Sequence, residues 1–562
     1  MNLLGKATDK EFWKEVREKD CYKKFRDELN DLWAKHVENG PIMQLKYRDF
    51  KMFWTTGNRS IYEKTYFTRR LALDCSVLLA LIYPEEEKYI TRVMDQVYAM
   101  CDEYTWCLPA HQGALEENNN VRVDLFAAET GFALAETYTM LGDRLEPLIR
   151  NRIVAEIDRR IVAPITEKDY YGWWEHGRAN WTAVCMGSVA CTFMLMRPEL
   201  AVNMIDRFNT SMDYYLSGFN DDGMCLEGCG YWHYGFGFFT VYADMVRKFT
   251  EGKVDFFARP KVKAVATFLQ KMFLSGKASV SFADGGRSCS YHLGLLHYLK
   301  NEYPDDVVVY KPEYSYNYDG CGRFCLQIRS ATWLNEDYYY NPAPDNVSGE
   351  YYAADSEWFV KRTDNYGFAA KGGHNGEPHN HNDVGSFIFA KNGEQLIMDV
   401  GAGSYTRQYF SSERYTMFPQ ADSRGHNLPI INGAVQAGGR DAKAKDSKVE
   451  NGVFSTDIAG AYNVEGLESV KRSFSFTDET VTLTDEFVYT GEGDIVDRLV
   501  SFHDIEKVKD GEIKFKTATV TYDPEKYELT LENEKCPFAD IYIKYASFKL
   551  KPGVTAFTVT IK

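Results

Sequence analysis

Histidine is concentrated in one short part of the chain. The sequence holds 11 His among 562 residues, and four of them fall within one short stretch: His374, His379, His381 and His426. Histidine titrates near neutral pH and is the commonest metal ligand, so this concentration indicates proton transfer, metal binding or both. The segment EPHNHNDVGSF, residues 377–387, places two of these histidines two positions apart in a polar turn that leads into an apolar run.

The residues after this turn suggest how metal ligands would be assembled. GSFIFA and QLIMDV flank KNGE, whose Asn-Gly pair favours a type I′ turn and predicts a β-hairpin. Pairing Lys391 with Glu394 would place Ser386 opposite Asp399, and His426 opens a later strand-like run. Two histidines and one aspartate suit Zn²⁺, with a fourth position left for water. The alternative is that the histidines only cap turns and bond the backbone.

A second candidate group lies in YYGWWEHGRANWTAVCMGSVACTFML. Asn180 stands just before a long helical run, where Asn is a favoured N-cap. The functional alternative is that Asn180 presents its amide to a substrate carboxylate, beside Glu175, His176 and Arg178.

A third candidate group lies in DDGMCLEGCGYWHYGFGFFTVYADM. A Gly-rich loop leads into a helix, and Tyr231 and Tyr234 are i, i+3 neighbours that share a helix face. Either both tyrosines belong to the core or its rim, or one of them is a general acid or base.

Two kinds of element must position these residues. Up to about residue 300, apolar residues recur three and four apart, as in LALDCSVLLALIYPEEEKYITRVMDQVYAM, which predicts stacked helical hairpins. After about residue 325, short alternating segments such as TVTLTDEFVY and TAFTVTIK predict an antiparallel β-sandwich. We therefore predict an all-helical domain over 1–310, a connector over 311–345 and a β-sandwich domain over 346–562.

Bulk composition narrows the class of partner. The chain is too long for one hydrophobic core, and its 44% hydrophobic and 26% charged residues are typical of a globular protein. A net charge of −16 argues against binding nucleic acid through its phosphates, although a locally basic cleft could still take an anionic small substrate. Aromatic residues make up 15% of the chain, and Tyr and Trp suit sugar-binding clefts.

Location follows from the N-terminus and the cysteines. The sequence contains no run of 18 apolar residues, so we expect no membrane span. The first 20 residues, MNLLGKATDKEFWKEVREKD, lack the pattern of a signal peptide. Twelve scattered cysteines are typical of reduced core thiols, so we expect a cytoplasmic protein. Cys225, Cys229, Cys321 and Cys325 form two C-x3-C pairs, which lack the usual C-x2-C spacing of a zinc knuckle.

Taken together, several motifs resemble the heparinase II/III-like polysaccharide lyases. On the helical side these are ANWTAV, EGCGYWHY, and YTWCLPAHQG followed by VRVDLFAAETGFALAETYTMLGD. On the strand side they are the histidine turn, KNGEQLIMDVGAGSY and RGHN. The motifs occur in the family order between residues 95 and 435, and they are specific to the family rather than to one substrate.

The resemblance implies a fold and a set of site residues. The fold is an N-terminal (α/α) toroid followed by a C-terminal antiparallel β-sandwich, with the site in the cleft between them. Asn180 matches the Asn that neutralises the substrate carboxylate, Tyr231 (or less well Tyr234) matches the catalytic Tyr, and His379 matches the catalytic His. His381, Asp399 and His426 match the positions that bind a metal in part of the family.

The activity that the resemblance implies is β-elimination in a uronic-acid glycan (a glycosaminoglycan, alginate or related uronan), which leaves 4,5-unsaturated uronate ends. We expect a structural divalent ion, first of all Zn²⁺, and an anionic oligo- or polysaccharide as partner. A homo-oligomer is compatible with the sequence. Further residues expected to contact substrate are Arg178, His176, Glu175, His111, Trp106 and Tyr405. The family is mostly secreted or periplasmic, whereas no export signal is predicted for this chain.

Two alternatives remain. Helical toroids also carry glycoside hydrolases, which need two carboxylates across the scissile bond. The carboxylates available for that role are Glu175, Glu227, Asp355 and Glu357. The other alternative is a carbohydrate-binding or scaffold protein without catalysis, whose binding would not depend on Tyr231.

Overall fold

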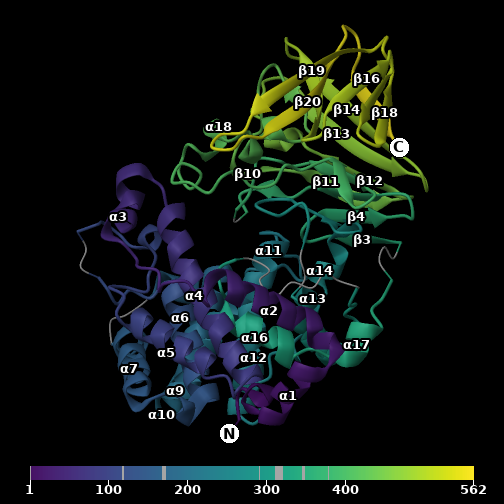
Figure 1. Cartoon of the computed structure of the whole chain (residues 1–562). Helices are drawn as coiled ribbons and strands as arrows, with labels where there is room; N and C mark the ends of the chain where they lie inside the picture. Colours follow the sequence, from purple (N-terminus) through teal and green to yellow (C-terminus); the bar gives the residue numbers. More distant parts are fainter. Residues whose placement is uncertain are drawn as a thin grey trace. The chain divides into compact units, whose positions relative to one another are not determined.

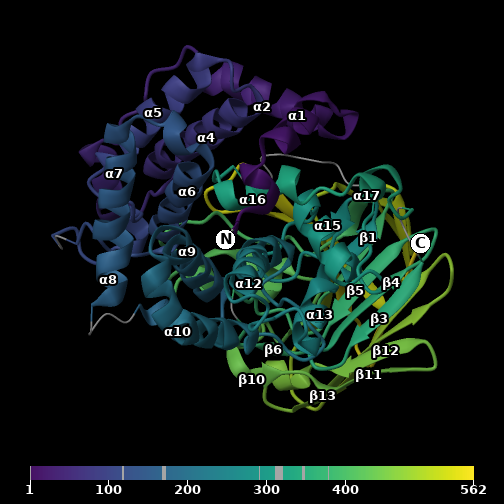
Figure 2. The same ribbon diagram turned by 90° about the horizontal axis from the view of Figure 1, so that it is seen from below.

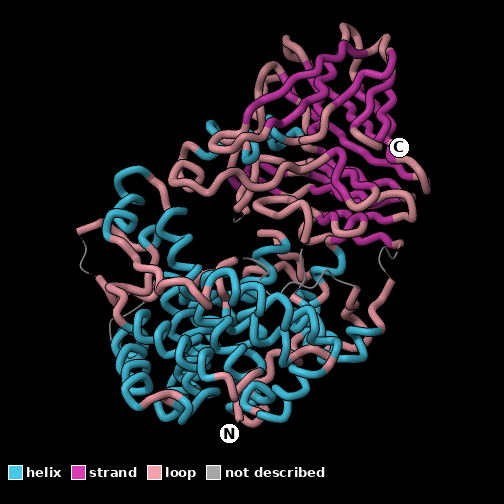
Figure 3. The backbone as a smooth tube through the Cα atoms, viewed as in Figure 1, coloured by secondary structure: helices cyan, strands magenta, loops and turns pink. Residues whose placement is uncertain are grey.

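The structure is a computed structural model that describes residues 2–116, 119–167, 172–289, 292–310, 320–344, 348–377 and 379–562. The chain divides into two compact units. The helical unit comprises Met1–Phe219, His233–Ala266 and Ser290–Ala343, and the β unit comprises Asn220–Trp232, Thr267–Cys289 and Pro344–Lys562. Figure 3 shows that most helices belong to the first of these units and most strands to the second, in agreement with the two predicted textures.

Five inner helices of the helical unit form a ring (Figure 2). Neighbouring members contact one another, and the last one returns to the first, which closes the ring. Because these helices are surrounded by others, they are apolar on most sides, and α6 and α9 are buried over nearly their whole length. The inner helices are α4 (Ser60–Ile82), α6 (Leu125–Leu141), α9 (Asn180–Met196), α12 (Gly237–Phe249) and α16 (Phe324–Thr332).

A second layer of helices packs outside this ring. The outer helices contact the inner ones, α2 and α5 against α4, α7 against α6, and α10 against α9. Their bounds are Lys23–His36 for α2, Glu87–Cys101 for α5, Pro147–Ile157 for α7 and Pro198–Leu216 for α10. The double layer confirms the predicted all-helical part and supplies the closure that sequence periodicity alone could not establish.

The remaining helices of this unit are short. They are α1 (Lys10–Glu18), α3 (Tyr47–Thr56), α8 (Ala163–Thr166), α13 (Pro260–Ala266), α15 (Leu293–Glu302) and α17 (Glu336–Tyr340). In the part of the chain that the structure describes, we find no helix of the length and apolar character needed to cross a membrane. The predicted connector over 311–345 differs from the structure, because its described part, 320–344, carries α16 and α17 and joins the helical unit. Residues 311–319 of the connector and residue 345 lie outside the described residues.

Three larger antiparallel sheets build the β unit (Figure 1). The eight-stranded sheet has the order β11-β12-β13-β14-β21-β18-β17-β16, the five-stranded sheet β3-β4-β5-β7-β8, and the four-stranded sheet β19-β20-β15-β9. Two-stranded sheets pair β1 with β2 and β10 with β6.

The strands of the β unit have the following bounds: β1 Phe273–Ser275, β2 Ala278–Ser279, β3 Gly349–Ala353, β4 Trp358–Arg362, β5 Gly367–Lys371, β6 His374–Asn375, β7 Phe387–Lys391, β8 Glu394–Ile397, β9 Ile430–Ile431, β10 Gly439–Lys443, β11 Lys445–Glu450, β12 Val453–Asp457, β13 Leu467–Phe476, β14 Val481–Tyr489, β15 Ile495–Ser501, β16 Ile505–Lys509, β17 Glu512–Phe515, β18 Ala518–Tyr522, β19 Tyr527–Lys535, β20 Tyr542–Leu550 and β21 Ala556–Ile561.

Aromatic side chains join these sheets into one core. Phe368 of the five-stranded sheet meets Phe474 of the eight-stranded sheet with ring centroids 4.9 Å apart. Phe548 of the four-stranded sheet meets Phe557 of the eight-stranded sheet at 5.2 Å. All four rings are fully buried. This burial is expected where the inward-facing side chains of packed sheets form a common core. The predicted β-sandwich is therefore confirmed.

Two segments from the predicted helical range, 220–232 and 267–289, belong to the β unit instead. They carry α11 (Cys229–Tyr231), α14 (Phe268–Lys271), β1 and β2. Strand β1 contacts β5 closely, because Gly367 has no side chain: a Cβ there would lie 2.1 Å from the Leu274 carbonyl oxygen. The predicted boundary at 310 thus misses these two segments, which matter for the site described below.

The hairpin predicted around KNGE is present as β7 and β8, with Lys391 opposite Glu394. Asn392 and Gly393 have φ values of 55° and 81°, the left-handed conformation that a type I′ turn requires. A register shift between Phe389 and Ala390 makes the predicted pairing of Ser386 with Asp399 wrong by one residue, because a bulge adds a residue on one strand.

Candidate active site and metal centre

Tyr231 and His379 meet within the β unit. Tyr231 ends the short helix α11, and its ring stacks on the His379 ring with centroids 4.5 Å apart and an angle of 25°. The Tyr231 hydroxyl lies 3.0 Å from the hydroxyl of Tyr405. Burial raises the pKa of Tyr231 above its usual value, so the phenol keeps its proton. Three residues predicted from separate motifs therefore lie together.

Asp284 is the centre of this group, although the sequence analysis did not identify it. Its side chain is 0% exposed, and five side chains donate hydrogen bonds to its two oxygens. The donors are His379 Nδ1 at 2.9 Å, Tyr405 Oη at 2.9 Å, His381 Nε2 at 3.1 Å, Tyr409 Oη at 2.5 Å and Arg414 Nη2 at 3.0 Å.

The donors keep Asp284 ionised. Burial alone would raise the pKa of Asp284, but the hydrogen bonds from the two histidines and the charge of Arg414 outweigh it, so the pKa lies well below its usual value. A carboxylate is an acceptor only, so each of the five groups must offer it a hydrogen. In the sequence SFADGGRS, the Gly-Gly pair after Asp284 was the only signal of a tight loop at this position.

Three glycines let the loops of this site approach one another. A Cβ at Gly228, which starts α11, would lie 3.0 Å from Gly285 Cα, and a Cβ at Gly401 would lie 2.7 Å from the Gly285 carbonyl oxygen. Gly228 and Gly401 also have positive φ values of 97° and 68°, which favour glycine. The loops carrying Tyr231, Asp284 and Tyr405 thus meet backbone to backbone.

Arg414, the first residue of the short helix α18 (Arg414–Met417), holds the histidine turn in place. Its Nη2 atom donates to the carbonyl oxygens of His379 and Asn380 at 3.3 and 3.1 Å, in addition to Asp284. His379 has a φ of 54°, a conformation that side chains other than Gly adopt rarely and only when their surroundings hold them. Its side chain remains 23% exposed, which leaves the ring accessible.

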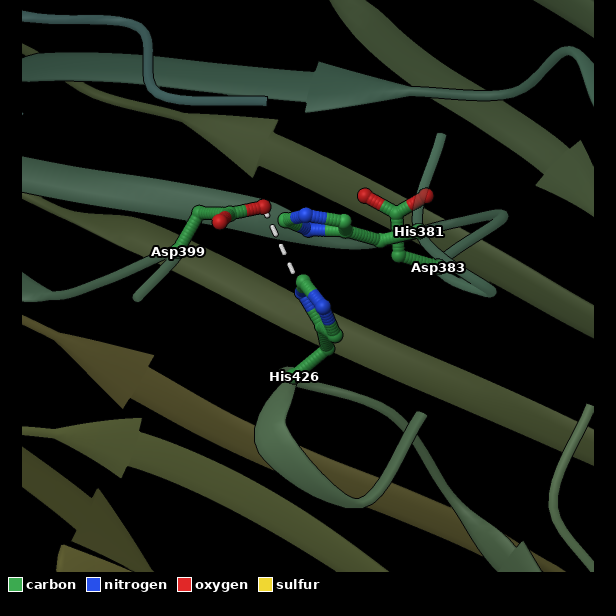
Figure 4. Close-up of side chains that lie close together, drawn as sticks. All are labelled: His381, Asp383, Asp399 and His426. Carbon is green, nitrogen blue, oxygen red and sulfur yellow. Dashed lines mark ion pairs between the residues drawn. The ribbon is translucent and has the colours of Figure 1, made fainter. Parts of the chain in front are cut away.

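His381, Asp399 and His426, the predicted ligands, gather with Asp383 into one buried cluster (Figure 4). One potential ligand atom from each of the four residues lies within 4.8 Å of the others. His426 Nδ1 and Asp399 Oδ2 are 3.3 Å apart. This is the one group of three or more such residues that we find in the described ranges, and none of the C-x3-C cysteines belongs to it.

Outer hydrogen bonds orient both histidines of the cluster. His381 Nε2 donates to Asp284, and His426 Nε2 donates to the Gln420 carbonyl oxygen at 2.9 Å. With Nε2 carrying the hydrogen, each neutral ring presents the lone pair of Nδ1 to the cluster. This arrangement is the usual outer shell of a metal-binding histidine.

Four buried polar atoms of the cluster are suited to bind a cation. His381 Nδ1, Asp383 Oδ2, Asp399 Oδ2 and His426 Nδ1 are buried and make no hydrogen bond in the structure. Unsatisfied buried polar atoms are costly, and four that converge need either protons or an ion. Burial alone would lower the pKa of His426, but the Asp399 charge outweighs it and raises that pKa, so a proton and a cation are alternative occupants. Two imidazoles and two carboxylates suit a divalent transition metal such as Zn²⁺.

Asp383 is a candidate ligand that was not predicted from the sequence. It lies two residues after His381 in HNHND, a spacing that could have been noticed. Its Oδ1 atom accepts from Lys371 Nζ at 2.6 Å, and Oδ2 faces the cluster without a partner. The fourth coordination position, which we predicted for water, is therefore available to the Asp383 carboxylate. Four protein ligands are typical of a closed structural metal site rather than an open catalytic one.

Tyr234 lies in a different environment from Tyr231, in the helical unit. Its hydroxyl donates to Glu129 Oε1 at 2.5 Å, and the Arg323 guanidinium lies 3.7 Å from its ring centroid. Tyr234 is 7% exposed, so its hydroxyl is not offered to solvent. Both tyrosines were candidates for the general acid, and which of them has that role stays a prediction. A π-helical segment, Trp232–Phe236, follows Tyr231 and breaks the regular spacing expected between the two.

Asn180 is the first residue of α9 and is 4% exposed. The cap position belongs to Ala179, and no side-chain cap hydrogen bond is formed, so the N-cap alternative is not supported. Gly235 packs against Asn180, because a Cβ there would lie 3.2 Å from Asn180 Cα. Its predicted role toward a carboxylate stays a prediction.

Trp181, the residue after Asn180 in α9, lies among other aromatic rings. Trp181 contacts the rings of His111 and Trp173 at centroid distances of 4.8 and 4.9 Å. His111 Nδ1 is held at 2.7 Å by Asp124, which also caps α6 through the Ala127 amide. Trp173 is 64% exposed. His111 is thus fixed beside Trp181, which in turn contacts the accessible indole of Trp173, a setting that suits sugar contact.

Two predicted substrate contacts need correction. Glu175 is 1% exposed, and its carboxylate accepts from Arg207 at 2.7 and 2.9 Å, so it is committed to a buried ion pair. Trp106 is also 1% exposed, and its indole nitrogen donates to the Met100 carbonyl oxygen at 3.0 Å. Both are core residues. His176 and Arg178 lie at exposed positions, and their predicted contacts with substrate stay predictions.

Comparisons with known proteins place this architecture. Neither a protein-family model nor a curated protein sequence matches the chain. Among solved structures, a heparinase III matches over 96% of this chain and 83% of its own, with 12% identity and a TM-score of 0.60. A heparan sulfate lyase from Pedobacter heparinus matches over 99% and 86%, with 12% identity and a TM-score of 0.59. A Paenibacillus xanthan lyase matches over 95% and 59%, with 9% identity and a TM-score of 0.51. The chain therefore has the fold of the heparinase-like polysaccharide lyases, a helical toroid and an antiparallel β-sandwich.

Proposed function

We propose that the protein is a polysaccharide lyase that cleaves uronic-acid glycans by β-elimination. The observation that carries this proposal is the stack of Tyr231 on His379, with both residues connected to the buried carboxylate of Asp284. The solved structures with the same fold are described as lyases of heparan sulfate and xanthan, which supports an anionic glycan as substrate. The substrate class is a glycosaminoglycan, alginate or related uronan.

The reaction needs one base and one acid. The base removes the hydrogen on C5 of the uronate, the electron pair forms the C4=C5 double bond, and the bond from C4 to the linking oxygen breaks. The leaving oxygen takes a proton from the acid. His379 and Tyr231 supply these two roles, and no step consumes water.

Stabilising the carbanion at C5 is the harder part. Negative charge spreads onto the uronate carboxylate, and donors aimed at that group lower the barrier. Asn180 is the donor that we propose for it, and removing such a donor typically costs about 3 kcal/mol of barrier. This role is tested by Asn180→Ala, which should lower kcat more than it raises KM.

The buried cluster is proposed to hold one divalent ion. His381, Asp383, Asp399 and His426 would bind it through the four unsatisfied atoms, and Zn²⁺ fits their chemistry. When bound, the ion supplies positive charge that fixes the histidine turn in one conformation. His381 transmits that order to Asp284 through its Nε2 hydrogen.

We further propose that the protein is cytoplasmic, as its cysteine usage suggests. None of the 12 cysteines, all of which lie in the described residues, forms a disulfide in the structure, and ten of them are buried. Thiol titration of the denatured, unreduced protein should find close to all 12 free. Several disulfides would contradict this location.

The hydrolase alternative has weaker support. Of its four candidate carboxylates, Glu175 is paired with Arg207, and Glu357 accepts from Gly373 N at 2.9 Å and Ser447 Oγ at 2.5 Å. A pair of catalytic carboxylates would need one group free to protonate the leaving oxygen. The Tyr231–His379 group would then have no function.

One assay separates these reactions. The protein is incubated with a panel of uronans, and ultraviolet absorbance and new reducing ends are recorded together. Elimination produces a double bond conjugated with the carboxylate, so both signals should rise in step. New reducing ends without absorbance would identify a hydrolase, and binding without either signal would identify a non-catalytic protein.

A further inference from the structure

We propose that Asp284 is a positioning residue that assigns the two chemical roles of this site, holding His379 as the base and Tyr231 as the acid. The proposal rests on the lyase function proposed above and deepens it. It depends on the five hydrogen bonds that converge on one carboxylate, and all of the residues involved belong to the β unit.

The role of His379 follows from its bond to Asp284. An ionised carboxylate accepts only, so the hydrogen between them belongs to His379 Nδ1 at 2.9 Å. In a neutral imidazole the second nitrogen, Nε2, then carries a lone pair and accepts a proton. Arg414 strengthens this arrangement, because it bonds both Asp284 and the His379 carbonyl oxygen. The ring is thus held in the tautomer of a base.

The role of Tyr231 follows from the same carboxylate through Tyr405. Tyr405 donates its hydroxyl hydrogen to Asp284 at 2.9 Å, so only its lone pairs face the Tyr231 hydroxyl at 3.0 Å. Tyr231 must therefore donate in that contact and holds its proton in the resting site. The protonated phenol is the form that an acid requires, and it gives this proton to the leaving oxygen during the elimination.

Asp284 itself is not a catalytic residue. Its side chain is 0% exposed, and its two oxygens already accept five hydrogens, so no substrate atom reaches it. Its remaining link is to His381, whose Nε2 hydrogen it accepts while Nδ1 faces the candidate ligands. One carboxylate therefore orients the base, the acid and a candidate metal ligand, as an outer-shell group does.

The test is Asp284→Asn, which keeps the size of the side chain but replaces one acceptor oxygen with a donor nitrogen. We expect kcat to fall about 10- to 100-fold or more, the usual effect of losing an outer-shell partner. KM should stay within about threefold, because Asp284 does not touch substrate. Asp457→Asn is the matched control: this carboxylate also accepts several hydrogen bonds, from Ala459 N, Ser469 Oγ and Val470 N, but lies outside the site. It should keep wild-type kcat.

A spectroscopic measurement separates positioning from general damage. Ring ¹⁵N shifts of ¹⁵N-histidine-labelled protein, assigned with His379→Gln, report which nitrogen carries the hydrogen. We expect His379 to be protonated at Nδ1 in the wild type and in Asp457→Asn. In Asp284→Asn we expect this preference to be lost.

If Asp284→Asn does not fold, Tyr405→Phe decides the proposal. It removes the hydroxyl between Asp284 and Tyr231, so kcat should fall while the His379 tautomer stays as in the wild type. Wild-type kcat in a folded Asp284→Asn or in Tyr405→Phe, or an unchanged His379 tautomer in Asp284→Asn, overturns the proposal. An inactive wild type would instead count against the lyase function, and the tautomer would still test the hydrogen bond to Asp284.

Discussion

Tyr231 and Tyr234 stand three residues apart, and each is associated with a carboxylate and an arginine, yet the two environments differ. Tyr234 donates directly to Glu129 under the Arg323 guanidinium and is 7% exposed. Tyr231 reaches Asp284 only through the Tyr405 hydroxyl, and Arg414 binds the carboxylate rather than the tyrosine. The first cluster is closed, whereas the second ends in a phenol stacked on a partly exposed histidine.

We propose that this difference separates a structural tyrosine, Tyr234, from a catalytic one, Tyr231. A direct bond to a buried carboxylate commits the phenol hydrogen and gives the group no freedom to react. An intervening hydroxyl keeps the tyrosine protonated but lets it exchange that weak contact for a substrate oxygen. The π-helical segment Trp232–Phe236 contributes to the separation, because it begins directly after Tyr231 and contains Tyr234.

The sharpest way to break this comparison is to remove each phenol hydroxyl in turn. Tyr231→Phe keeps the ring and its stack on His379 but deletes the proton, so kcat on a cleaved uronan should fall about 10²- to 10⁴-fold with KM little changed. Tyr234→Phe should keep kcat within a few-fold and lose about 1–3 kcal/mol of stability, because Glu129 loses its donor. Steady-state kinetics and denaturant unfolding measure the two effects. Equal kinetic losses in both variants would contradict the distinction.

Loss of the metal should affect the hydrogen-bond network of Asp284, His379, Tyr405 and Tyr231, here called the open network, and not the Tyr234–Glu129–Arg323 cluster, here called the closed cluster. His381→Ala deletes a candidate ligand and one donor to Asp284, so the metal content should fall from about one equivalent to nearly none. The melting temperature should fall by several degrees, and kcat should fall with it. His374→Ala is the matched control, because that histidine is ion-paired with Glu377 and lies outside the ligand group. Elemental analysis decides: negligible metal in wild type and variant alike would remove the metal claim.

The closed cluster has its own signature in pH dependence. Burial raises the pKa of Glu129 from 4.5 to about 7, with Arg323 opposing this shift. The folded state therefore binds this proton more tightly than the unfolded state, and its contribution to stability declines as pH rises from about 4.5 to 7. Glu129→Gln should flatten the decline in melting temperature across that window. An unchanged slope would show that Glu129 ionises normally.

The smallest effect that we expect concerns the glycine contacts of the open network. Gly401→Ala adds a Cβ 2.7 Å from the Gly285 carbonyl oxygen at a φ of 68°, and should cost about 1–3 kcal/mol with a moderate loss of kcat. Gly433→Ala has a similar φ of 73° but meets nothing within 4 Å, so it shows the backbone cost alone. Thermal unfolding of the pair isolates the contact. Equal losses would mean that the loops can separate at no cost.

The sequence could predict what is local and periodic. Helix period and strand alternation identified both units, and the Asn-Gly pair located the β7–β8 hairpin, because these signals lie within short windows. The residues of the histidine turn and Tyr231 were found because their motifs resemble a family. Tyr405 was included on the same basis.

The sequence could not predict what depends on distant segments. Asp284 carries no motif, and its importance comes from five donors that lie 95 to 130 residues later in the chain. From the sequence, Glu175 was a candidate for substrate contact, but its buried carboxylate forms an ion pair with Arg207. Burial and partners of this kind follow from tertiary packing, which a window of sequence does not contain.

The two early segments that join the β unit also have a consequence for biosynthesis. Arg414 lies 130 residues after Asp284. At about 5–20 residues per second, translation leaves this carboxylate without that partner for roughly 7 to 26 seconds. Until His379 is made, 95 residues after Asp284, the carboxylate has none of its five donors. A C-terminal fragment that starts near the predicted connector would express a sandwich without Tyr231 or Asp284. Co-expression of two fragments cut there would require the N-terminal piece to donate both segments after synthesis.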